Sequence, residues 1–118
     1  MASSDSPSVP EVSAEDAIGE VSRGITVVDV REQSEWDAGH IAGAQLVPLS
    51  ELEERAVELP LATRLLIVCH SGMRSLRATT FLRSRGVDAV NVEGGMMAWA
   101  ASGGALSSVT TTANTDET

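Results

Sequence analysis

The chain has 118 residues, of which 42% are hydrophobic, a length and composition that fit one soluble globular domain. Its formal net charge of −9 argues against a nucleic-acid partner or an anionic membrane surface, and we interpret the acidity as a source of solubility. No apolar run approaches the roughly 20 residues of a membrane span. From the acidity and the lack of such a run we expect no membrane partner. The single cysteine excludes an internal disulfide, so we expect a cytoplasmic protein with a free thiol.

The chain divides into a central domain and two polar ends. Residues 1–9 are small and polar, which predicts a flexible leader, and they lack the basic start and apolar stretch of a secretory signal. Residues 105–118 are polar and show no periodicity, which predicts a disordered tail. The remaining residues, 10–104, are predicted to fold as one domain.

Strand and helix patterns alternate along the first half of this domain. Short apolar runs and helical spacing predict strands over residues 10–12, 25–30 and 44–47, and helices over residues 13–23, 33–38 and 50–59. Ser13 and Ser50 each begin a sequence like a capping box. The two helices that begin at these serines are expected to end at Gly24 and Pro60.

The second half is organised around the only cysteine, Cys69. It follows an apolar run over residues 65–68 that lacks polar alternation, which predicts a strand buried on both faces. A helix is expected from Ser75, whose side chain should cap it. The last two predicted elements are a strand over residues 87–92 and a helix over residues 95–102.

Cys69 therefore lies at the carboxyl end of a central strand, the end where open α/β sheets bind ligands. Backbone N–H groups of the following loop and helical turn should converge on the sulfur and stabilise its thiolate. Between Leu59 and Val87 there is no acidic residue, and Arg77 lies in the first helical turn, where a cation does not suit the helix dipole. These basic surroundings favour a reactive thiol over an inert buried cysteine.

Four segments resemble the signatures of rhodanese-type sulfurtransferases, in the expected order. The loop CHSGMRS, residues 69–75, is similar to the Cys-x-x-Gly-x-Arg loop that carries a persulfide in that family. The other three segments are Asp29–Glu32, Gly39–Ala44 and Glu93–Trp99.

The alternation of strands and helices predicts an α/β protein with a parallel sheet. The resemblance adds a rhodanese-like three-layer sandwich, with a central, mostly parallel five-stranded sheet and helices on both faces. It also implies the strand order 1-5-4-2-3, which the spacing of the elements does not give.

The resemblance further implies a sulfurtransferase, in which Cys69 takes sulfur from a small anionic donor such as thiosulfate and holds it as a persulfide. A thiophilic acceptor, such as cyanide, a low-molecular-weight thiol or a partner protein, then removes the sulfur. The chain has no second cysteine, so an external group must resolve the persulfide. No cofactor is implied, and two histidines and one cysteine far apart in sequence do not predict a metal site.

The rest of the loop is expected to bind the substrate. Gly72 should adopt a positive φ so that loop amides turn inward. Arg74 should contact an anion at the rim, with an ordinary solvated arginine as the alternative. We weigh His70 as a general base against a role of its backbone N–H alone, and favour the latter. The predicted substrate-binding residues are His70, Ser71, Gly72, Met73, Arg74 and Ser75.

Other side chains are expected to support the loop. Asp29 and Arg31 follow a neighbouring strand, and we favour structural ion pairs for them over a catalytic role. Glu32 and Glu35 are candidate partners of Arg31. His40 is expected to be a packed, hydrogen-bonded turn residue. The residues expected in the core or in the wall of the site are Trp36, Trp99, Met96 and Met97.

Several other functions are weighed against thiosulfate chemistry. A cysteine phosphatase loop is one residue longer and would place its arginine at Ser75. His70 and Arg74 depart from the Cys-Gly-[Ser/Thr]-Gly-Val-Thr loop of mercaptopyruvate enzymes, which makes mercaptopyruvate the weaker donor. A non-catalytic interaction module is disfavoured because the cysteine is retained. A thiol-dependent reductase, for example of arsenate, would use the same anion cradle and would need a reductant.

Overall fold

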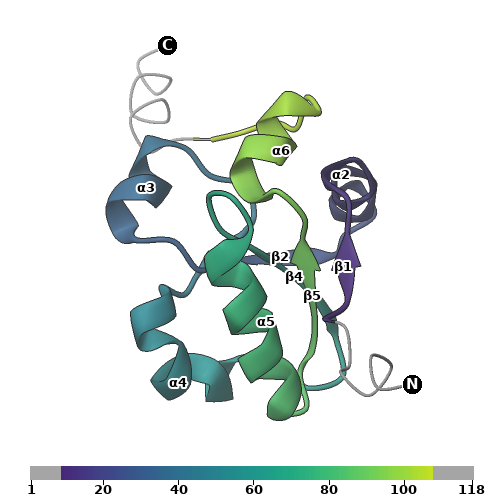
Figure 1. Cartoon of the computed structure of the whole chain (residues 1–118). Coiled ribbons are helices and arrows are strands. Elements are labelled where there is room, and N and C mark those ends of the chain that lie inside the picture. The colour runs from purple at the N-terminus through teal and green to yellow at the C-terminus, as the bar shows by residue number, and fades with distance from the viewer. Residues whose placement is uncertain (1–8, 108–118) are drawn as a thin grey trace, which may run out of the picture.

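Five parallel strands form one sheet at the centre of the computed structural model, which describes residues 9–107 (Figure 1). The strands are β1 (Glu11–Val12), β2 (Thr26–Asp29), β3 (Gln45–Leu46), β4 (Arg64–Val68) and β5 (Asp88–Val92). Their order across the sheet is β1-β5-β4-β2-β3, and every neighbouring pair is parallel. The predicted fold class and strand order are confirmed.

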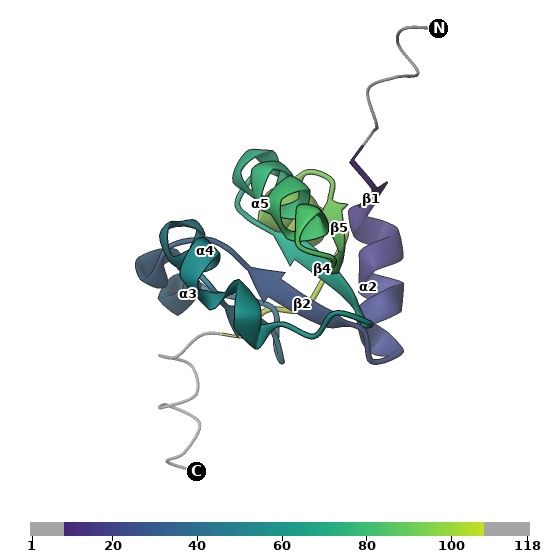
Figure 2. The same ribbon diagram turned by 90° about the horizontal axis from the view of Figure 1, so that it is seen from below.

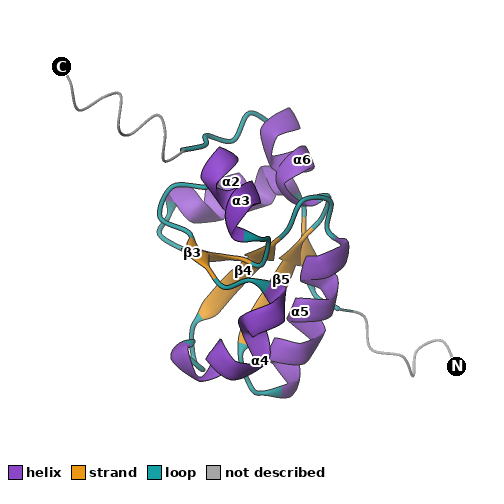
Figure 3. Ribbon diagram, turned by 90° about the vertical axis from the view of Figure 1, so that its left-hand side faces the viewer, coloured by secondary structure: helices purple, strands orange, loops and turns teal. Residues whose placement is uncertain are grey.

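Helices cover both faces of this sheet (Figures 2 and 3). They are α2 (Ala14–Ser22), α3 (Gln33–Ala38), α4 (Leu52–Arg55), α5 (Met73–Ser84) and α6 (Gly95–Ala101), with the 3₁₀ turns η1 (Leu49–Glu51) and η2 (Ala56–Glu58) on either side of α4. Side chains of α2 and α6 pack on one face, and those of α4 and α5 pack on the other.

Strand β4 supplies side chains to both halves of the core, as the unbroken apolar run predicts. Leu65 and Ile67 belong to the cluster under α4 and α5, and Leu66 and Val68 belong to the cluster under α2 and α6. All four side chains are at most 2% exposed. Cys69 continues this alternation and falls on the α5 side of the sheet.

Of the three helix starts at which a capping serine is predicted, one agrees with the structure and two differ. Ser13 caps α2, because its Oγ accepts the Asp16 N–H at 3.0 Å. Ser50 caps nothing, since the chain already turns at Pro48 into η1 and Ser50 lies inside that turn. Helix α5 begins at Met73 rather than Ser75, because Gly72 takes the capping position with φ of 101°. The helix therefore starts closer to Cys69 than predicted.

The described part of the chain extends beyond the predicted domain end at residue 104. Ser107 and His40 exchange two backbone hydrogen bonds of 2.7 Å, and Ala105 accepts the Trp99 indole N–H at 3.0 Å. The first residues of the predicted tail thus lie against the domain. The rest of that tail and predicted leader residues 1–8 are outside the described residues.

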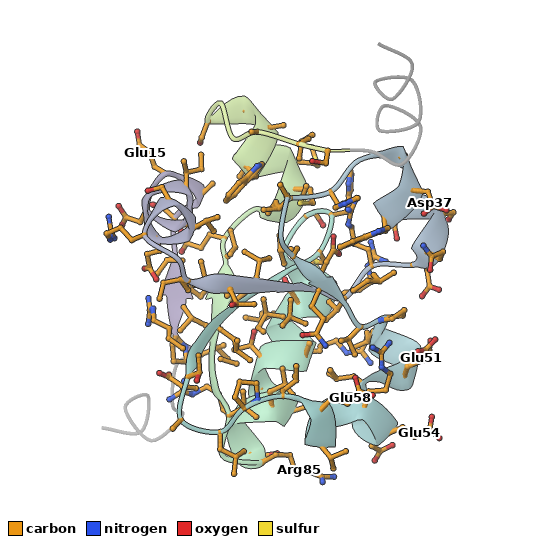
Figure 4. The ribbon with its side chains drawn as sticks, turned by 180° about the vertical axis from the view of Figure 1, so that it is seen from behind. Glu15, Asp37, Glu51, Glu54, Glu58 and Arg85 are labelled. Atoms are coloured by element: carbon orange, nitrogen blue, oxygen red, sulfur yellow. The ribbon has the colours of Figure 1, made fainter. Side chains whose placement is uncertain are left out.

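Most of the described acidic side chains lie on the outside of the domain. Figure 4 shows Glu15, Asp37, Glu51 and Glu54 pointing away from it, and all four are exposed.

Within residues 9–107, no helix combines the length and the apolar character that crossing a membrane requires.

Candidate active site

The sulfur of Cys69 lies inside a cradle of backbone N–H groups at the carboxyl end of β4. Its Sγ accepts the Gly72 N–H at 3.1 Å and the Ser75 N–H at 3.2 Å. Only 1% of Cys69 is exposed. N–H groups directed at a sulfur favour its anionic form, so the loop can stabilise a thiolate or a sulfur species attached to it.

The loop carbonyls point away from this cradle and are bound by the first turn of α6. Met96 donates its N–H to the Cys69 carbonyl at 2.7 Å, and Met97 donates to the His70 carbonyl at 3.0 Å. Helix α6 and the loop between β4 and α5 lie side by side in Figure 1. This second set of hydrogen bonds holds the loop with its N–H groups facing the sulfur.

Glycine at position 95 is what allows this close approach. Gly95 has φ of 56°, and a Cβ built on it would lie 2.7 Å from the His70 carbonyl carbon and still closer to the Cys69 oxygen. Gly72 has φ of 101°, in the positive range expected for it, and a Cβ there would lie 3.1 Å from the Gly94 nitrogen. Two glycine-containing segments far apart in sequence therefore meet at the site.

Ser75 is a buried part of the site and does not cap α5. It lies in the first turn of the helix and is 0% exposed. Its Oγ lies 2.6 Å from Asn91 Oδ1 and 3.3 Å from the Cys69 Sγ. The prediction of a cap was wrong because Gly72 takes that position, which leaves the Ser75 side chain facing the sheet.

Asn91 was not identified from the sequence. It is a polar residue within the otherwise apolar interior of β5, and it is 1% exposed. A single amide among the Ala and Val residues of that strand was the available signal, since a buried polar side chain needs partners.

Arg74 lies at the rim of the cradle and is paired with Glu35 of α3. The guanidinium makes two hydrogen bonds to the carboxylate, of 2.9 and 2.8 Å. Hydrogen bonding from Arg74 lowers the pKa of Glu35 from its ordinary value of 4.5 to about 2. The pair ties α3 to α5 across the mouth of the site. A contact between Arg74 and an anionic substrate stays a prediction.

Arg31 is paired with Asp29 rather than with Glu32 or Glu35. Its Nε and Nη2 donate to the two Asp29 oxygens at 2.9 and 2.8 Å, and Nη2 also donates to the Gly39 carbonyl at 2.8 Å. Asp29 is 0% exposed and Arg31 is 5% exposed. The prediction of Glu32 and Glu35 as partners was wrong because Glu35 reaches Arg74, while Glu32 forms a capping box with Glu35 at the start of α3.

The remaining loop residues face outward. His70 and Ser71 are exposed, and Met73 is 69% exposed. Within residues 9–107, no hydrogen bond joins the His70 ring to the sulfur or to another group, so a role as general base stays untested. His70 lines a surface pocket of about 330 Å³ together with Met96, Met97, Ala100 and Leu106.

His40 is a packed, hydrogen-bonded turn residue, as expected, and its partner Trp36 is half-buried and belongs to neither core cluster. The rings of Trp36 and His40 stack with their centroids 3.7 Å apart, and His40 Nδ1 lies 2.9 Å from the Trp36 carbonyl oxygen. Trp99 and Met96 are buried, whereas Met97 is largely exposed.

Among the described residues, His, Cys, Asp and Glu form no cluster of three that could hold a metal ion.

The Arg74–Glu35 pair predicts a specific acid sensitivity. Because folding lowers the Glu35 pKa from 4.5 to about 2, the pair stabilises the fold above about pH 4.5, and that contribution is lost as the pH falls toward 2. Glu35→Gln should therefore lower the free energy of unfolding by ~1 kcal/mol at pH 7, since the pair is partly solvated, and by less near pH 2. Denaturant unfolding at several pH values measures this difference, and Glu53→Gln, an exposed carboxylate, should keep the parental pH dependence.

Comparison with known proteins places most of this chain in one family. The sequence profile of the rhodanese-like domain matches residues 12–102. A putative sulfur carrier protein, YrkF of Bacillus subtilis, is 38% identical over 100 residues, which cover 82% of this chain and 54% of YrkF. This chain therefore spans about half the length of that relative.

Two further relatives extend the similarity. Thiosulfate sulfurtransferase GlpE of Pseudoalteromonas translucida is 30% identical over 65% of this chain and 74% of its own length. The crystal structure of a rhodanese-related protein from Thermoplasma volcanium has a TM-score of 0.78 at 35% sequence identity, and the match covers 83% of this chain and 97% of that one.

Proposed function

This chain belongs to the family of rhodanese-like domains, and we propose that it transfers sulfane sulfur through a persulfide on Cys69. The observation that carries the proposal is the pair of N–H groups at 3.1 and 3.2 Å from the Cys69 Sγ. A nucleophilic thiolate needs such donors, and they remain available to a sulfur chain attached to Sγ. The retained cysteine in this cradle also supports catalysis over a purely structural interaction module.

The proposed reaction has two steps and needs no oxidant. The Cys69 thiolate attacks the outer sulfur of thiosulfate, a new S–S bond forms, and sulfite leaves with the electron pair of the broken S–S bond. An acceptor thiolate or cyanide then attacks the outer sulfur of the persulfide. Its bond to Sγ breaks, and Cys69 leaves as the thiolate with which the cycle began.

Thiosulfate is the proposed donor, and two observations support it over mercaptopyruvate. GlpE, which is 30% identical over the matched region, is named a thiosulfate sulfurtransferase. His70 and Arg74 replace the glycine and threonine of the mercaptopyruvate pattern. Arg74 at the rim is the proposed contact for the anion, and it would have to share its guanidinium between the anion and Glu35.

The proposed natural acceptor is a thiol on a small molecule or on a partner protein. The similarity to a putative sulfur carrier protein supports this class of acceptor. Cyanide serves as the assay acceptor, because it releases thiocyanate and regenerates the thiolate.

Thiocyanate release from thiosulfate and cyanide tests the proposal. We expect turnover by the wild-type protein, slower turnover with mercaptopyruvate and none by Cys69→Ser. If the wild-type protein releases no thiocyanate with either donor but reduces arsenate with a thiol reductant, the reductase alternative replaces this proposal.

A further inference from the structure

A chain of buried polar groups connects the sulfur of Cys69 to the edge of the sheet. Ser75 Oγ lies 3.3 Å from Sγ and 2.6 Å from Asn91 Oδ1, and Asn91 Nδ2 donates to Glu11 Oε2 at 2.8 Å. Glu11 is on the edge strand β1, directly opposite Asn91 of β5, and its side chain reaches the solvent. The chain therefore runs from an exposed carboxylate to a buried sulfur.

The Glu11 carboxylate fixes the direction of every hydrogen bond in this series of polar groups. An ionised carboxylate only accepts, so the Asn91 Nδ2 must face Glu11 and the Asn91 Oδ1 must face Ser75. The Ser75 hydroxyl has a single hydrogen, and the 2.6 Å distance to Asn91 Oδ1 shows where that hydrogen goes. The sulfur therefore faces a lone pair of Ser75 Oγ.

A lone pair at this position affects the charged and neutral forms of the sulfur differently. A thiol can donate its S–H to Ser75 Oγ, whereas a thiolate finds no donor there and relies on the two backbone N–H groups. The inner sulfur of a persulfide is uncharged and needs no further donor. The series of hydrogen bonds from Glu11 to Ser75 thus disfavours the free thiolate of Cys69 relative to both the thiol and the sulfur-loaded form.

We infer that Glu11 is a positioning residue: through Asn91 it keeps the Ser75 hydroxyl from donating to Cys69 and so limits the reactivity of the free thiol. If Glu11 could donate, Asn91 could turn, its Nδ2 could donate to Ser75, and the Ser75 hydroxyl could donate to the thiolate. The inference deepens the proposed function, because it concerns the same nucleophile, but thiol alkylation tests it without any sulfur donor.

Alkylation of Cys69 by iodoacetamide, measured as a function of pH, is the experiment. Glu11→Gln places an amide that can donate at the outer end of this series of hydrogen bonds, and the midpoint of the pH profile should fall by about one unit. Well below both midpoints, alkylation should then be about threefold faster, because the larger thiolate fraction outweighs the lower nucleophilicity of the thiolate. Glu93→Gln is the matched control, since it also removes one exposed carboxylate next to β5 but has no link to Asn91. Its midpoint should stay close to that of the wild type.

Ser75→Ala tests whether the Ser75 hydroxyl donates to the sulfur, without changing any charge. In the wild-type background, this substitution should not raise the midpoint of the alkylation profile, because the hydroxyl does not donate to the thiolate. In the Glu11→Gln background, it should abolish the fall in the midpoint that Glu11→Gln causes. The variants leave unchanged the other charged or titratable groups near the thiol, which are the Arg74–Glu35 and Arg31–Asp29 pairs and the exposed His70.

Two outcomes would overturn the inference. One is an equal shift in Glu11→Gln and Glu93→Gln, which would reduce the effect to net charge. The other is a raised midpoint in Ser75→Ala alone, which would show that the hydroxyl already donates to the thiolate. If Ser75→Ala does not fold, the comparison of the two glutamine variants still decides.

Discussion

Replacing Gly95 by alanine should lower the free energy of unfolding by about 3 kcal/mol, since it adds the strain of a left-handed backbone to that of overpacking. The added Cβ would lie 2.7 Å from the His70 carbonyl carbon, and the atoms that it meets are backbone atoms that cannot turn aside. The loop can only move away from α6, which breaks the hydrogen bonds from Met96 and Met97. Denaturant unfolding and the rate of Cys69 alkylation measure the two consequences.

Gly43→Ala is the matched control for this substitution. Gly43 has φ of 83°, so alanine meets the same kind of backbone strain, but no atom lies within 4 Å of the added Cβ. We expect a loss of about 1 kcal/mol and normal alkylation of Cys69. Equal losses in the two variants would mean that packing of Gly95 against the loop has no part in stability.

Arg31→Ala should lower the free energy of unfolding by about 3–5 kcal/mol, the range for removing one partner of a buried ion pair. Asp29 is 0% exposed, so its carboxylate would remain buried without a cation. The hydrogen bond to the Gly39 carbonyl would be lost as well, which frees the segment after α3 from the end of β2. Denaturant unfolding measures the change.

A second substitution identifies the cause. Asp29→Asn in the Arg31→Ala background removes the unpaired charge, so it should recover part of the lost stability. Arg55→Ala removes an arginine from an exposed ion pair and should have little effect. If Asp29→Asn further destabilises Arg31→Ala, the buried charge is not the cause of the loss.

The parts of the fold that depend on local pattern could be predicted from the sequence. The apolar run over residues 65–68 predicts the doubly buried strand β4, and the spacing of Leu52, Ala56 and Leu59 predicts the buried side of the segment around α4. The order of the strands came from the resemblance to a family, because the spacing of elements does not determine which strands become neighbours.

The partners of the charged residues could not be predicted, for a physical reason. Arg74 and Glu35 are 39 residues apart, and only the tertiary fold brings the start of α5 close to α3. The role of Gly95 depends in the same way on how closely α6 approaches the loop. For Ser75 the error is the opposite. The local capping rule predicts a helix cap, but the side chain faces the sheet and lies against Asn91.

Intact mass after incubation with thiosulfate tests the persulfide most directly, on the wild-type protein and on Cys69→Ser. We expect the wild type to gain roughly 32 Da, one sulfur atom, and to lose it again on treatment with cyanide or dithiothreitol. Cys69→Ser should gain nothing. A wild-type mass that stays unchanged with thiosulfate, mercaptopyruvate and a persulfide-charged desulfurase would contradict the proposed sulfur transfer.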